Sequence, residues 1–186
     1  MIDIVVAQPK HLDAIVAIAE QAKKNMAAMG IDQWQRGYPN RDIWISDIAA
    51  QGLYVALQNE RVVGVLRYYN MPDAAYKTIE GDWLTAGPYA TIHRCAVDAN
   101  LRGQGIMGKL FTFACDKATT DKMESIRIDT HKDNSPMLQA IKKAGFTLCG
   151  TITLVEGVET GSTRIGFEKM LSLPNQTRNL SPKAEY

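Results

Sequence analysis

The stretch of sequence that decides the fold is a glycine-containing segment in the second half of the chain, Val97-Asp98-Ala99-Asn100-Leu101-Arg102-Gly103-Gln104-Gly105-Ile106-Met107-Gly108-Lys109-Leu110. It joins a predicted strand to a predicted amphipathic helix. Glycine lacks a Cβ, so the backbone N–H groups of such a loop can approach a ligand closely, and the start of a helix adds partial positive charge. With the cation of Arg102 beside these donors, the segment predicts a pyrophosphate-binding loop. The alternative is a loop whose glycines serve only a tight turn.

The apolar pattern on both sides of this loop predicts a mixed succession of strands and helices. Strands are predicted over residues 2–7, 52–58, 61–69, 89–97, 125–131, 147–155 and 163–170, and helices over 12–29, 42–50, 102–120 and 134–144. Residues 30–41 and 70–88 show little periodicity and are predicted as loops, and a loop as long as the second is often functional. This order predicts an α/β domain of the mixed α+β kind around a central mixed sheet.

Composition and charge limit the classes of partner. Of the 186 residues, 46% are hydrophobic and 22% are charged, and the net charge is +1 with the basic residues scattered. A nucleic-acid-binding protein usually carries a strong basic excess, so we expect no such partner. No apolar run approaches the ~20 residues of a membrane helix, and no basic flank precedes an apolar stretch at Met1, so we expect a cytoplasmic protein without a membrane contact.

The cysteines predict neither disulfides nor a metal site. Cys95, Cys115 and Cys149 are odd in number, far apart and surrounded by apolar residues. No pair of cysteine or histidine residues has the spacing of zinc ligands. We therefore expect reduced, buried thiols and no bound metal.

The glycine loop also matches a dinucleotide-binding pattern. Gly103-x-Gly105-x-x-Gly108 has the required spacing, and Asp129 lies 21 residues beyond Gly108, so a nicotinamide-dependent oxidoreductase is an alternative. Three features argue against it. Residues 98–102 separate the strand from the first glycine, more than half of the chain precedes the motif, and only 57 residues follow Asp129. That remainder is too short for the second half of a doubly wound sheet.

Two blocks of the sequence resemble the GNAT superfamily of N-acetyltransferases. One block corresponds to the family's Arg/Gln-x-x-Gly-x-Gly/Ala loop and reads Arg102-Gly103-Gln104-Gly105-Ile106-Met107, with Met107 where glycine or alanine is usual. The other block is similar to the family's Asn-x-x-Ala…Lys-x-Gly-Phe helix and reads Asn134-Ser135-Pro136-Met137, then Lys142-Lys143-Ala144-Gly145-Phe146. The resemblance implies one acetyltransferase domain over residues 1–171, with a central, mostly antiparallel mixed sheet flanked by helices. Residues 172–186 lack apolar rhythm and are predicted as a flexible tail.

The resemblance implies acetyl-CoA as the acyl donor. Backbone groups of Cys95, Ala96 and Val97 would then pair with the pantetheine arm in the manner of an added strand. A backbone N–H of the same region could bind the thioester oxygen as negative charge develops on it. The amides of Gly103, Gln104, Gly105, Ile106, Met107 and Gly108 would hold the pyrophosphate, together with Arg102, and Asn134 would hydrogen-bond the cofactor. This chemistry requires no metal.

Acetyl transfer to an amine requires a neutral amine, so a proton acceptor is needed in the site. Asp129 falls where some family members carry a glutamate base, and alternation predicts that it shares a strand face with Arg127. The alternative is a structural pair between Asp129 and Arg127 or a neighbouring strand. His93 has a suitable intrinsic pKa and is predicted to share a strand face with Cys95, although a lone strand histidine is more often a packing residue.

A proton donor for the departing thiolate is harder to assign. The family's usual tyrosine, seven residues after Asn134, is replaced by Ile141. One alternative is that Tyr89 or a water molecule protonates the thiolate. The other is that the thiolate leaves without assistance. In that case catalysis would depend on positioning alone.

The acceptor is weakly encoded in the sequence. Trp34, Tyr38 and Trp83 lie in loops expected to flank the acceptor cleft, where they would contact a cationic or apolar substrate or serve only to anchor the loops. We expect a small-molecule or peptide amine as substrate, and a homodimer is a common assembly in the superfamily. The leading hypothesis is an acetyl-CoA-dependent N-acetyltransferase that transfers the acetyl group directly in a ternary complex. A further hypothesis, suggested by Ile141, is a module that binds acyl-CoA without catalysis.

Overall fold

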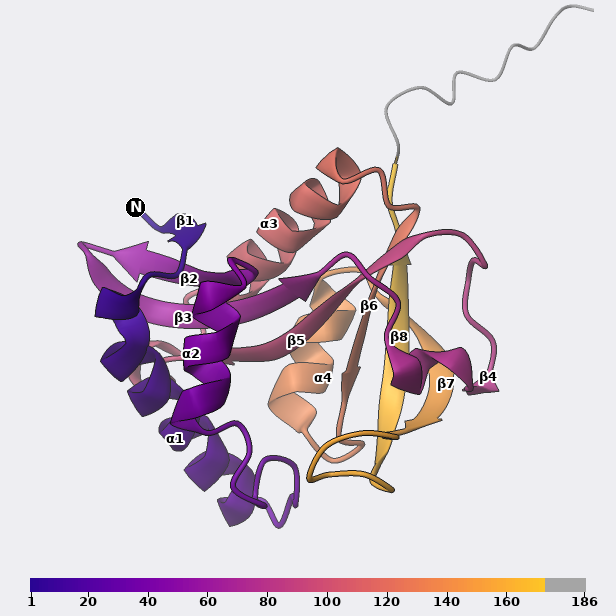
Figure 1. Ribbon diagram of the computed structural model, residues 1–186, viewed down its shortest axis with the longest axis horizontal. Coiled ribbons are helices and arrows are strands. Elements are labelled where there is room, and N and C mark those ends of the chain that lie inside the picture. The colour runs from indigo at the N-terminus through magenta and orange to yellow at the C-terminus, as the bar shows by residue number, and fades with distance from the viewer. Residues whose placement is uncertain (173–186) are drawn as a thin grey trace, which may run out of the picture.

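The computed structural model describes residues 1–172, so the predicted tail lies outside the described residues except for Ser172. Eight strands form one sheet in the order β1-β2-β3-β5-β6-β8-β7-β4 (Figure 1). The strands are β1 (Asp3–Val6), β2 (Leu53–Gln58), β3 (Arg61–Tyr69), β4 (Glu80–Gly81), β5 (Tyr89–Val97), β6 (Ser125–Thr130), β7 (Thr147–Thr153) and β8 (Thr163–Met170). The helices are α1 (Leu12–Ala28), α2 (Arg41–Ala49), α3 (Ile106–Thr120) and α4 (Ser135–Lys143), with short 3-10 segments η1 (Pro9–His11), η2 (Ala74–Lys77) and η3 (Ala99–Leu101).

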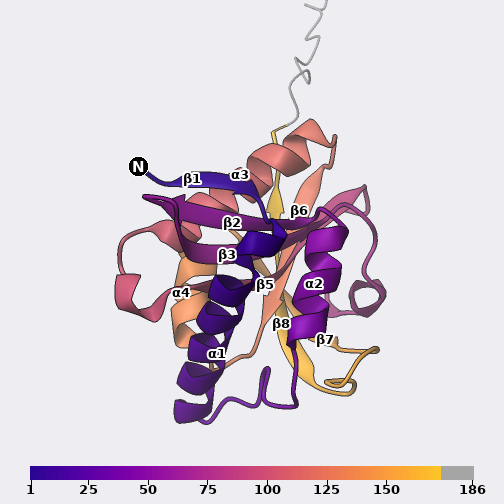
Figure 2. The ribbon, with the colours of Figure 1, turned by 60° about the vertical axis from the view of Figure 1, so that its left-hand side comes forward.

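The predicted fold class is confirmed. The pairing of β5 with β6 is parallel, and the remaining neighbours pair antiparallel, which gives a mostly antiparallel mixed sheet. The helices cover both faces of the sheet, with α1 and α2 on one side and α3 and α4 on the other (Figure 2). A doubly wound sheet would require several parallel neighbours, so this topology is incompatible with the nicotinamide alternative.

Differences from the predicted elements occur where backbone geometry or tertiary contacts override the apolar pattern. The helix predicted from Arg102 begins at Ile106, because Gly103 and Gly105 have φ angles of 80° and 75°, which a helix cannot contain. The predicted loop 70–88 contains η2 and the two-residue strand β4. In β4, Gly81 approaches Gly150 of β7 so closely that a Cβ on Gly81 would lie 2.2 Å from the Cys149 carbonyl oxygen.

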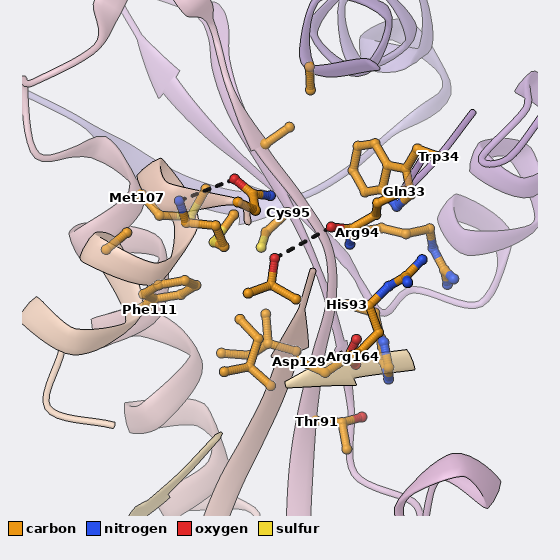
Figure 3. Close-up of a pocket in the computed structure, with 18 of the residues that line it drawn as sticks. Gln33, Trp34, Thr91, His93, Arg94, Cys95, Met107, Phe111, Asp129 and Arg164 are labelled. Atoms are coloured by element: carbon orange, nitrogen blue, oxygen red, sulfur yellow. Dashed lines mark hydrogen bonds between the residues drawn. The ribbon is translucent and has the colours of Figure 1, made fainter. Parts of the chain in front are cut away.

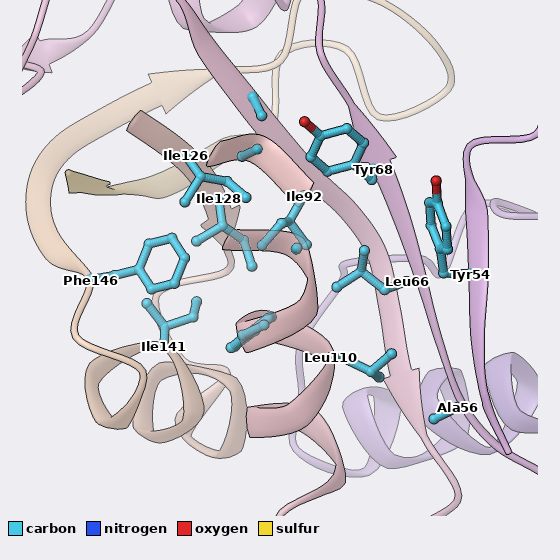
Figure 4. Close-up of a cluster of buried hydrophobic side chains, with 14 of the residues drawn as sticks. Tyr54, Ala56, Leu66, Tyr68, Ile92, Leu110, Ile126, Ile128, Ile141 and Phe146 are labelled. Atoms are coloured by element: carbon cyan, nitrogen blue, oxygen red, sulfur yellow. The ribbon is translucent and has the colours of Figure 1, made fainter. Parts of the chain in front are cut away.

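Two hydrophobic cores lie on the two faces of the sheet. Alternation along β2 sends Tyr54 and Ala56 toward α3 and sends Leu53 and Val55 toward α1 and α2. The core beneath α3 and α4 is the larger of the two and contains the fully buried Leu110 (Figure 4). It fixes the direction of α3 and therefore the position of the glycine loop at the start of that helix.

The centre of the sheet opens where β5 and β6 part. Their parallel pairing spans four residue pairs and ends at Ile92 and Ile128 (Figure 1). On the opposite edge of β5, the pairing with β3 shifts register, so that Arg94 and Cys95 both stand opposite Leu66. Arg94 has a φ of 43°, as expected for a β-bulge residue.

The bulge corrects the predicted alternation along β5. In a regular strand Ile92 and Ala96 would share a face, but Ile92 packs in the α3 core and Ala96 in the α1 core. Cys95 packs against the same core as Ile92. Regular alternation would place His93 and Cys95 on one face. The extra residue puts an irregularity between them, and the simple alternation rule does not hold there.

We expect Leu110→Ala to destabilise the domain by about 2–5 kcal/mol, because it removes a fully buried side chain and leaves a cavity between α3 and the sheet. Urea unfolding followed by circular dichroism measures the change. The matched control is Leu148→Ala on β7, where the side chain is 61% exposed and the expected change is about 0.5 kcal/mol or less. Equal effects of the two substitutions would contradict the assigned core.

Candidate active site

A cavity of about 1230 Å³ lies where β5 and β6 separate. Its wall brings together most of the residues predicted for the site, namely Trp34, Tyr38, His93, Cys95, Ala96, Val97, Arg102, Gly103, Gly105, Ile106, Met107, Gly108, Asp129 and Asn134. The wall does not include Tyr89, Trp83 or Gln104. Within the cavity, His93, Asp129 and Arg164 lie together, apart from Met107 and Phe111 of α3 (Figure 3).

The glycine loop presents a row of backbone donors to this cavity. Among residues 1–172, no group accepts a hydrogen bond from the amides of Gly103 through Gly108, and the first α3 amide with a partner is that of Lys109. A Cβ added to Gly103, Gly105 or Gly108 would meet no atom of the described residues within 4 Å, its chain neighbours and its own helix backbone aside, so the space in front of the loop is open. Free N–H groups at a helix start, with open space before them, form an anion-binding site.

Asp98 holds the base of the loop and was not identified by the sequence analysis. Its side chain is only 3% exposed, and its Oδ1 accepts from the Asn100 amide at 3.0 Å. Its Oδ2 binds Arg61 Nη2 at 2.7 Å, while Gln21 Oε1 accepts from the Ala99 amide at 3.1 Å. These contacts fix η3 and so position the loop that follows it.

The end of β5 offers another set of unpaired backbone groups. Beyond Ile92 the strand has no β6 partner in the described part of the chain, so Cys95, Ala96 and Val97 border the cavity with one backbone edge open. Burial raises the pKa of the Cys95 thiol to about 12, so this cysteine is a packing residue rather than a nucleophile. The open edge can accept an extended ligand as an additional strand.

Asn134 lies at the start of α4. Its Oδ1 accepts from the Met137 amide at 3.4 Å and caps the helix, while Nδ2 lies 3.8 Å from Met26 Sδ. Asn134 therefore has a structural role in addition to its position on the cavity wall. Ile141, on the same helix, is fully buried in the core near Phe146 and is not part of the wall.

Asp129 and Arg127 do not form the structural pair that their shared strand face allows. Arg127 pairs with the fully buried Glu168, its Nε lying 3.0 Å from Oε1, and not with Asp129. Asp129 Oδ1 accepts a hydrogen bond from the hydroxyl of Tyr76 at 2.7 Å. Burial raises the pKa of Asp129, while the nearby His93, the Tyr76 hydrogen bond and Arg164 act in the opposite direction.

His93 has a carboxylate partner on the opposite side. Its Nε2 lies 3.0 Å from Asp73 Oδ2, and the ring meets the edge of Tyr69 with centroids 5.5 Å apart. Burial acts to raise the pKa of Asp73, but contacts with His93, the Ala75 amide and Arg94 outweigh it and hold that pKa below its usual value. Asp73 Oδ1 caps η2 through the Ala75 amide at 2.8 Å, which fixes the carboxylate in place.

Arg94, the bulge residue, links α2 and the loop 30–41 to the sheet. It makes two hydrogen bonds to Asp47 of α2, at 2.7 and 2.8 Å, and donates to the hydroxyls of Tyr38 and Tyr69. Tyr38 therefore reaches the cavity wall as part of a buried hydrogen-bond network. Because Arg94 is surrounded by acceptors, it remains charged and serves as an anchor.

Trp34 is held in place by a second buried ion pair. Its backbone N–H donates to Glu159 Oε1 at 2.5 Å, and Glu159 Oε2 lies 3.2 Å from Arg164 Nη2. Both charged side chains are nearly inaccessible, at 9% and 2% exposure. This ties the loop 30–41 to the β7–β8 loop across the cavity.

Trp83 and Tyr89 lie behind the wall, in contrast to the expectation from the sequence. The Trp83 indole donates to the Tyr76 carbonyl oxygen at 3.0 Å, and its ring lies 4.2 Å from the Arg127 guanidinium. The Tyr89 ring also packs on the Arg127 guanidinium, with its centroid 3.7 Å away. The Tyr89 hydroxyl accepts a hydrogen bond from the Asp73 amide. Both rings are thus occupied by packing beneath the site.

Several residues of the site were not found from the sequence, namely Gln33, Asp73, Tyr76, Arg94, Glu159 and Arg164. Of these, Asp73 and Tyr76 had a detectable signal, because both lie in the long loop 70–88 that the sequence marks as a functional candidate. The others come from loops, from the bulge of β5 and from β8, with no local pattern that marks them. Their roles arise from contacts between segments far apart in the chain.

Comparison with known proteins identifies the family. The family model described as the acetyltransferase (GNAT) family matches residues 15–146. The chain belongs to the GNAT acetyltransferase family. Its fold is similar to that of a GNAT-family acetyltransferase from Streptococcus agalactiae, with 30% identity, a TM-score of 0.80, and coverage of 92% of this chain and 96% of that one.

Two further GNAT-like structures share the fold at lower identity. An N-acetyltransferase from Staphylococcus aureus is 21% identical with a TM-score of 0.66, over 92% of this chain and 99% of that one. YncA from Salmonella typhimurium, whose structure contains its cofactor acetyl-CoA, is 17% identical with a TM-score of 0.64, over 92% and 94%. No curated protein sequence matches this GNAT chain significantly. Within residues 1–172, no helix of the GNAT domain is both long and apolar enough to cross a bilayer.

We expect Asp129→Asn to raise the melting temperature of this GNAT domain by an amount that grows with pH. A carboxyl group whose folded-state pKa is raised costs little stability while protonated, and costs more as pH rises through that pKa. Asparagine keeps an oxygen that accepts from Tyr76 and carries no charge. Differential scanning fluorimetry from about pH 4.5 to 8 measures the difference, and a pH-independent or negative difference would refute the raised pKa of Asp129.

Proposed function

We propose that this GNAT protein is an acetyl-CoA-dependent N-acetyltransferase that acetylates a primary amine of a small molecule or peptide by direct transfer in a ternary complex. The observation that carries the proposal is the glycine loop, whose amides from Gly103 to Gly108 have no hydrogen-bond partner among residues 1–172 and whose glycines border the same cavity as Asp129 and His93. The reaction requires one end of the cavity to bind the anionic cofactor and the other end to accept a proton from the amine.

The cofactor fits the first of these ends. The loop amides and Arg102 would bind the pyrophosphate, since the glycines leave the space before them open. The pantetheine arm would then lie along Cys95, Ala96 and Val97 and pair with the open edge of β5. When bound, acetyl-CoA supplies an activated acetyl group as a thioester. A backbone N–H of this strand would donate to the thioester oxygen as charge develops on it.

The acceptor would enter between Asp129 and His93. Among the described residues, four acids border the cavity, namely Asp73, Asp129, Glu156 and Glu159. Asp73 and Glu159 have basic partners, and Glu156 is exposed. Asp129 has no basic group within salt-bridge distance in residues 1–172, so an incoming ammonium group would supply the missing counter-charge.

Asp129 would then accept the proton of the ammonium group. The neutral nitrogen attacks the carbonyl carbon, the carbon–sulfur bond breaks, and the proton that the acetylated nitrogen loses passes to the CoA thiolate. Tyr89 is not required as the acid in this proposal, because its hydroxyl lies behind the wall and accepts from Asp73. His93 is the other titratable group beside the acceptor position.

A module that binds acyl-CoA without turnover is the alternative candidate. The observation in its favour is Ile141, because the family's tyrosine position is here a core residue with no exposure. Incubation with acetyl-CoA and a broad panel of amines and peptides, with free thiol as the readout, separates the two. Thiol release dependent on an amine supports the enzyme, and tight binding without release supports the module. If acetyl-CoA neither binds nor raises the melting temperature, both proposals fail.

We expect Gly105→Asp to weaken acetyl-CoA binding by at least about tenfold, which is about 1.4 kcal/mol in binding free energy. The new carboxylate would project toward the pyrophosphate position and repel it, at a backbone φ of 75° that also strains the residue. Isothermal titration calorimetry measures the dissociation constant. The matched control is Gly30→Asp, with a φ of 73°, at a glycine that does not line the cavity. Wild-type affinity in Gly105→Asp would reject the placement of the loop.

We also expect Asp129→Asn to reduce kcat by on the order of 100-fold, because the amide cannot accept the proton. The dissociation constant of acetyl-CoA should stay within about threefold of the wild-type value, since the proposed pyrophosphate loop lies at the other end of the cavity. Steady-state kinetics with the amine found in the panel provides the test. The exposed Asp116 of α3 offers a control in Asp116→Asn, and unchanged kcat in Asp129→Asn would remove the proposed base role.

A further inference from the structure

Tyr76 is a buried tyrosine in direct contact with the proposed base, and neither motif of the sequence includes it. Its side chain is 2% exposed, and its hydroxyl donates to Asp129 Oδ1 at 2.7 Å. It comes from η2, in the long connection between β3 and β5, while Asp129 stands on β6. The hydrogen bond therefore joins two separate segments of the chain that both line the cavity.

The packing around Tyr76 leaves its hydroxyl little freedom. Its ring lies 5.2 Å from that of Trp83, 6.3 Å from that of Tyr89 and 6.0 Å from that of His93, measured between centroids. Its backbone oxygen accepts from the Trp83 indole. Burial and the neighbouring carboxylate raise the pKa of Tyr76 well above its usual value, so it remains a hydrogen-bond donor across the physiological range.

We propose that Tyr76 is the positioning residue of the reaction: it binds Oδ1 of Asp129 and thereby directs Oδ2 toward the acceptor amine. This inference rests on the proposed function. Tyr76 is protonated throughout, and the proton of the ammonium group moves to Asp129 Oδ2. The tyrosine stabilises the ionised carboxylate before this transfer and the carboxyl group after it. A carboxylate with one oxygen fixed presents the other in a single orientation, which is the geometric requirement of general base catalysis.

The position of Tyr76 is distinct from that of the family's usual tyrosine. The tyrosine expected on α4 is Ile141, which lies in the core and cannot reach the cavity. Tyr76 supplies a phenol to the cavity from a different element. Its partner is the carboxylate, and its hydroxyl already donates to that group, so the role assigned here is orientation of the base and not protonation of the thiolate.

Asp129 is surrounded by several titratable and charged groups, and the effect of Tyr76 must be separated from theirs. These groups come from β5, β8 and the segment leading to η2, and they are His93, Cys95, Arg164 and Asp73. Tyr76→Phe leaves all of them in place and removes one hydroxyl. Because the Tyr76 hydrogen bond lowers the pKa of Asp129, its loss raises that pKa further.

The kinetic test is the pH profile of Tyr76→Phe with the amine substrate found in the panel. We expect kcat to fall about tenfold with little change in the KM for acetyl-CoA. The rising limb of kcat against pH should move to higher pH, since a base with a higher pKa loses its proton later. The matched control is Tyr68→Phe, which removes a phenol-to-carboxylate hydrogen bond of 2.8 Å to Asp121, away from the cavity wall. A fall in kcat with an unmoved rising limb would overturn the proposal.

A further measurement does not depend on turnover, so failure of the proposed function can be distinguished from failure of this inference. Tyr76→Phe should destabilise the fold more at about pH 8 than at about pH 5, because the ionised carboxylate loses its donor. In the Asp129→Asn background this pH dependence should disappear. A destabilisation by Tyr76→Phe that is independent of pH, or one that persists unchanged in Asp129→Asn, would show that Tyr76 is only a packing residue.

Discussion

The site depends on the end of pairing between β5 and β6 at Ile92 and Ile128. Neighbouring strands normally satisfy each other's backbone groups, so a split in the middle of a sheet is unfavourable unless both halves are held from outside. Here β5 is paired with β3, and β6 is paired with β8 over six residue pairs. Each half of the sheet is thus rigid by itself, and the gap between them is a stable feature of the fold. It is this gap that leaves one edge of β5 open to a ligand.

The bulge at Arg94 completes this arrangement. A φ of 43° is unfavourable for a side chain as large as arginine, and such strain persists only where surrounding contacts offset it. The two hydrogen bonds to Asp47 and those to Tyr38 and Tyr69 provide these contacts. Because the bulge inserts one residue, it changes which side chains of β5 face each core. The side of the cavity that Tyr38 borders is therefore fixed by the same irregularity that connects the sheet to α2.

The part of the site that sequence analysis could predict is the part with local causes. A glycine loop between a strand and a helix requires left-handed backbone at Gly103 and Gly105, and this is visible in the residue types. Strands and helices follow from apolar periodicity in the same way. By contrast, Tyr76 and Asp129 are 53 positions apart, and no property of either residue indicates the other. The bulge had the same consequence for β5, where regular alternation grouped His93 with Cys95.

Trp83 shows a further limit of local reasoning, because an aromatic residue in a polar loop can face either a ligand or a cation of the protein itself. The Arg127–Glu168 pair, formed between β6 and β8, decides this in favour of the protein. Such pairings are set by sheet order, which the residue pattern alone does not determine.

The charge distribution of the cavity gives a physical basis for the proposed proton transfer. An aliphatic ammonium group in water holds its proton far more tightly than a carboxylate does, with ordinary pKa values of about 10.4 and 3.9. In a site of low dielectric constant, the charged pair is less favourable than in water, whereas the neutral amine and carboxylic acid lose little. Burial of Asp129 raises its pKa and so reduces the difference between the two groups. A partly buried carboxylate with a phenol as its protein partner can attract the ammonium group by charge and then accept its proton, so that both partners become neutral as the acetyl group is transferred.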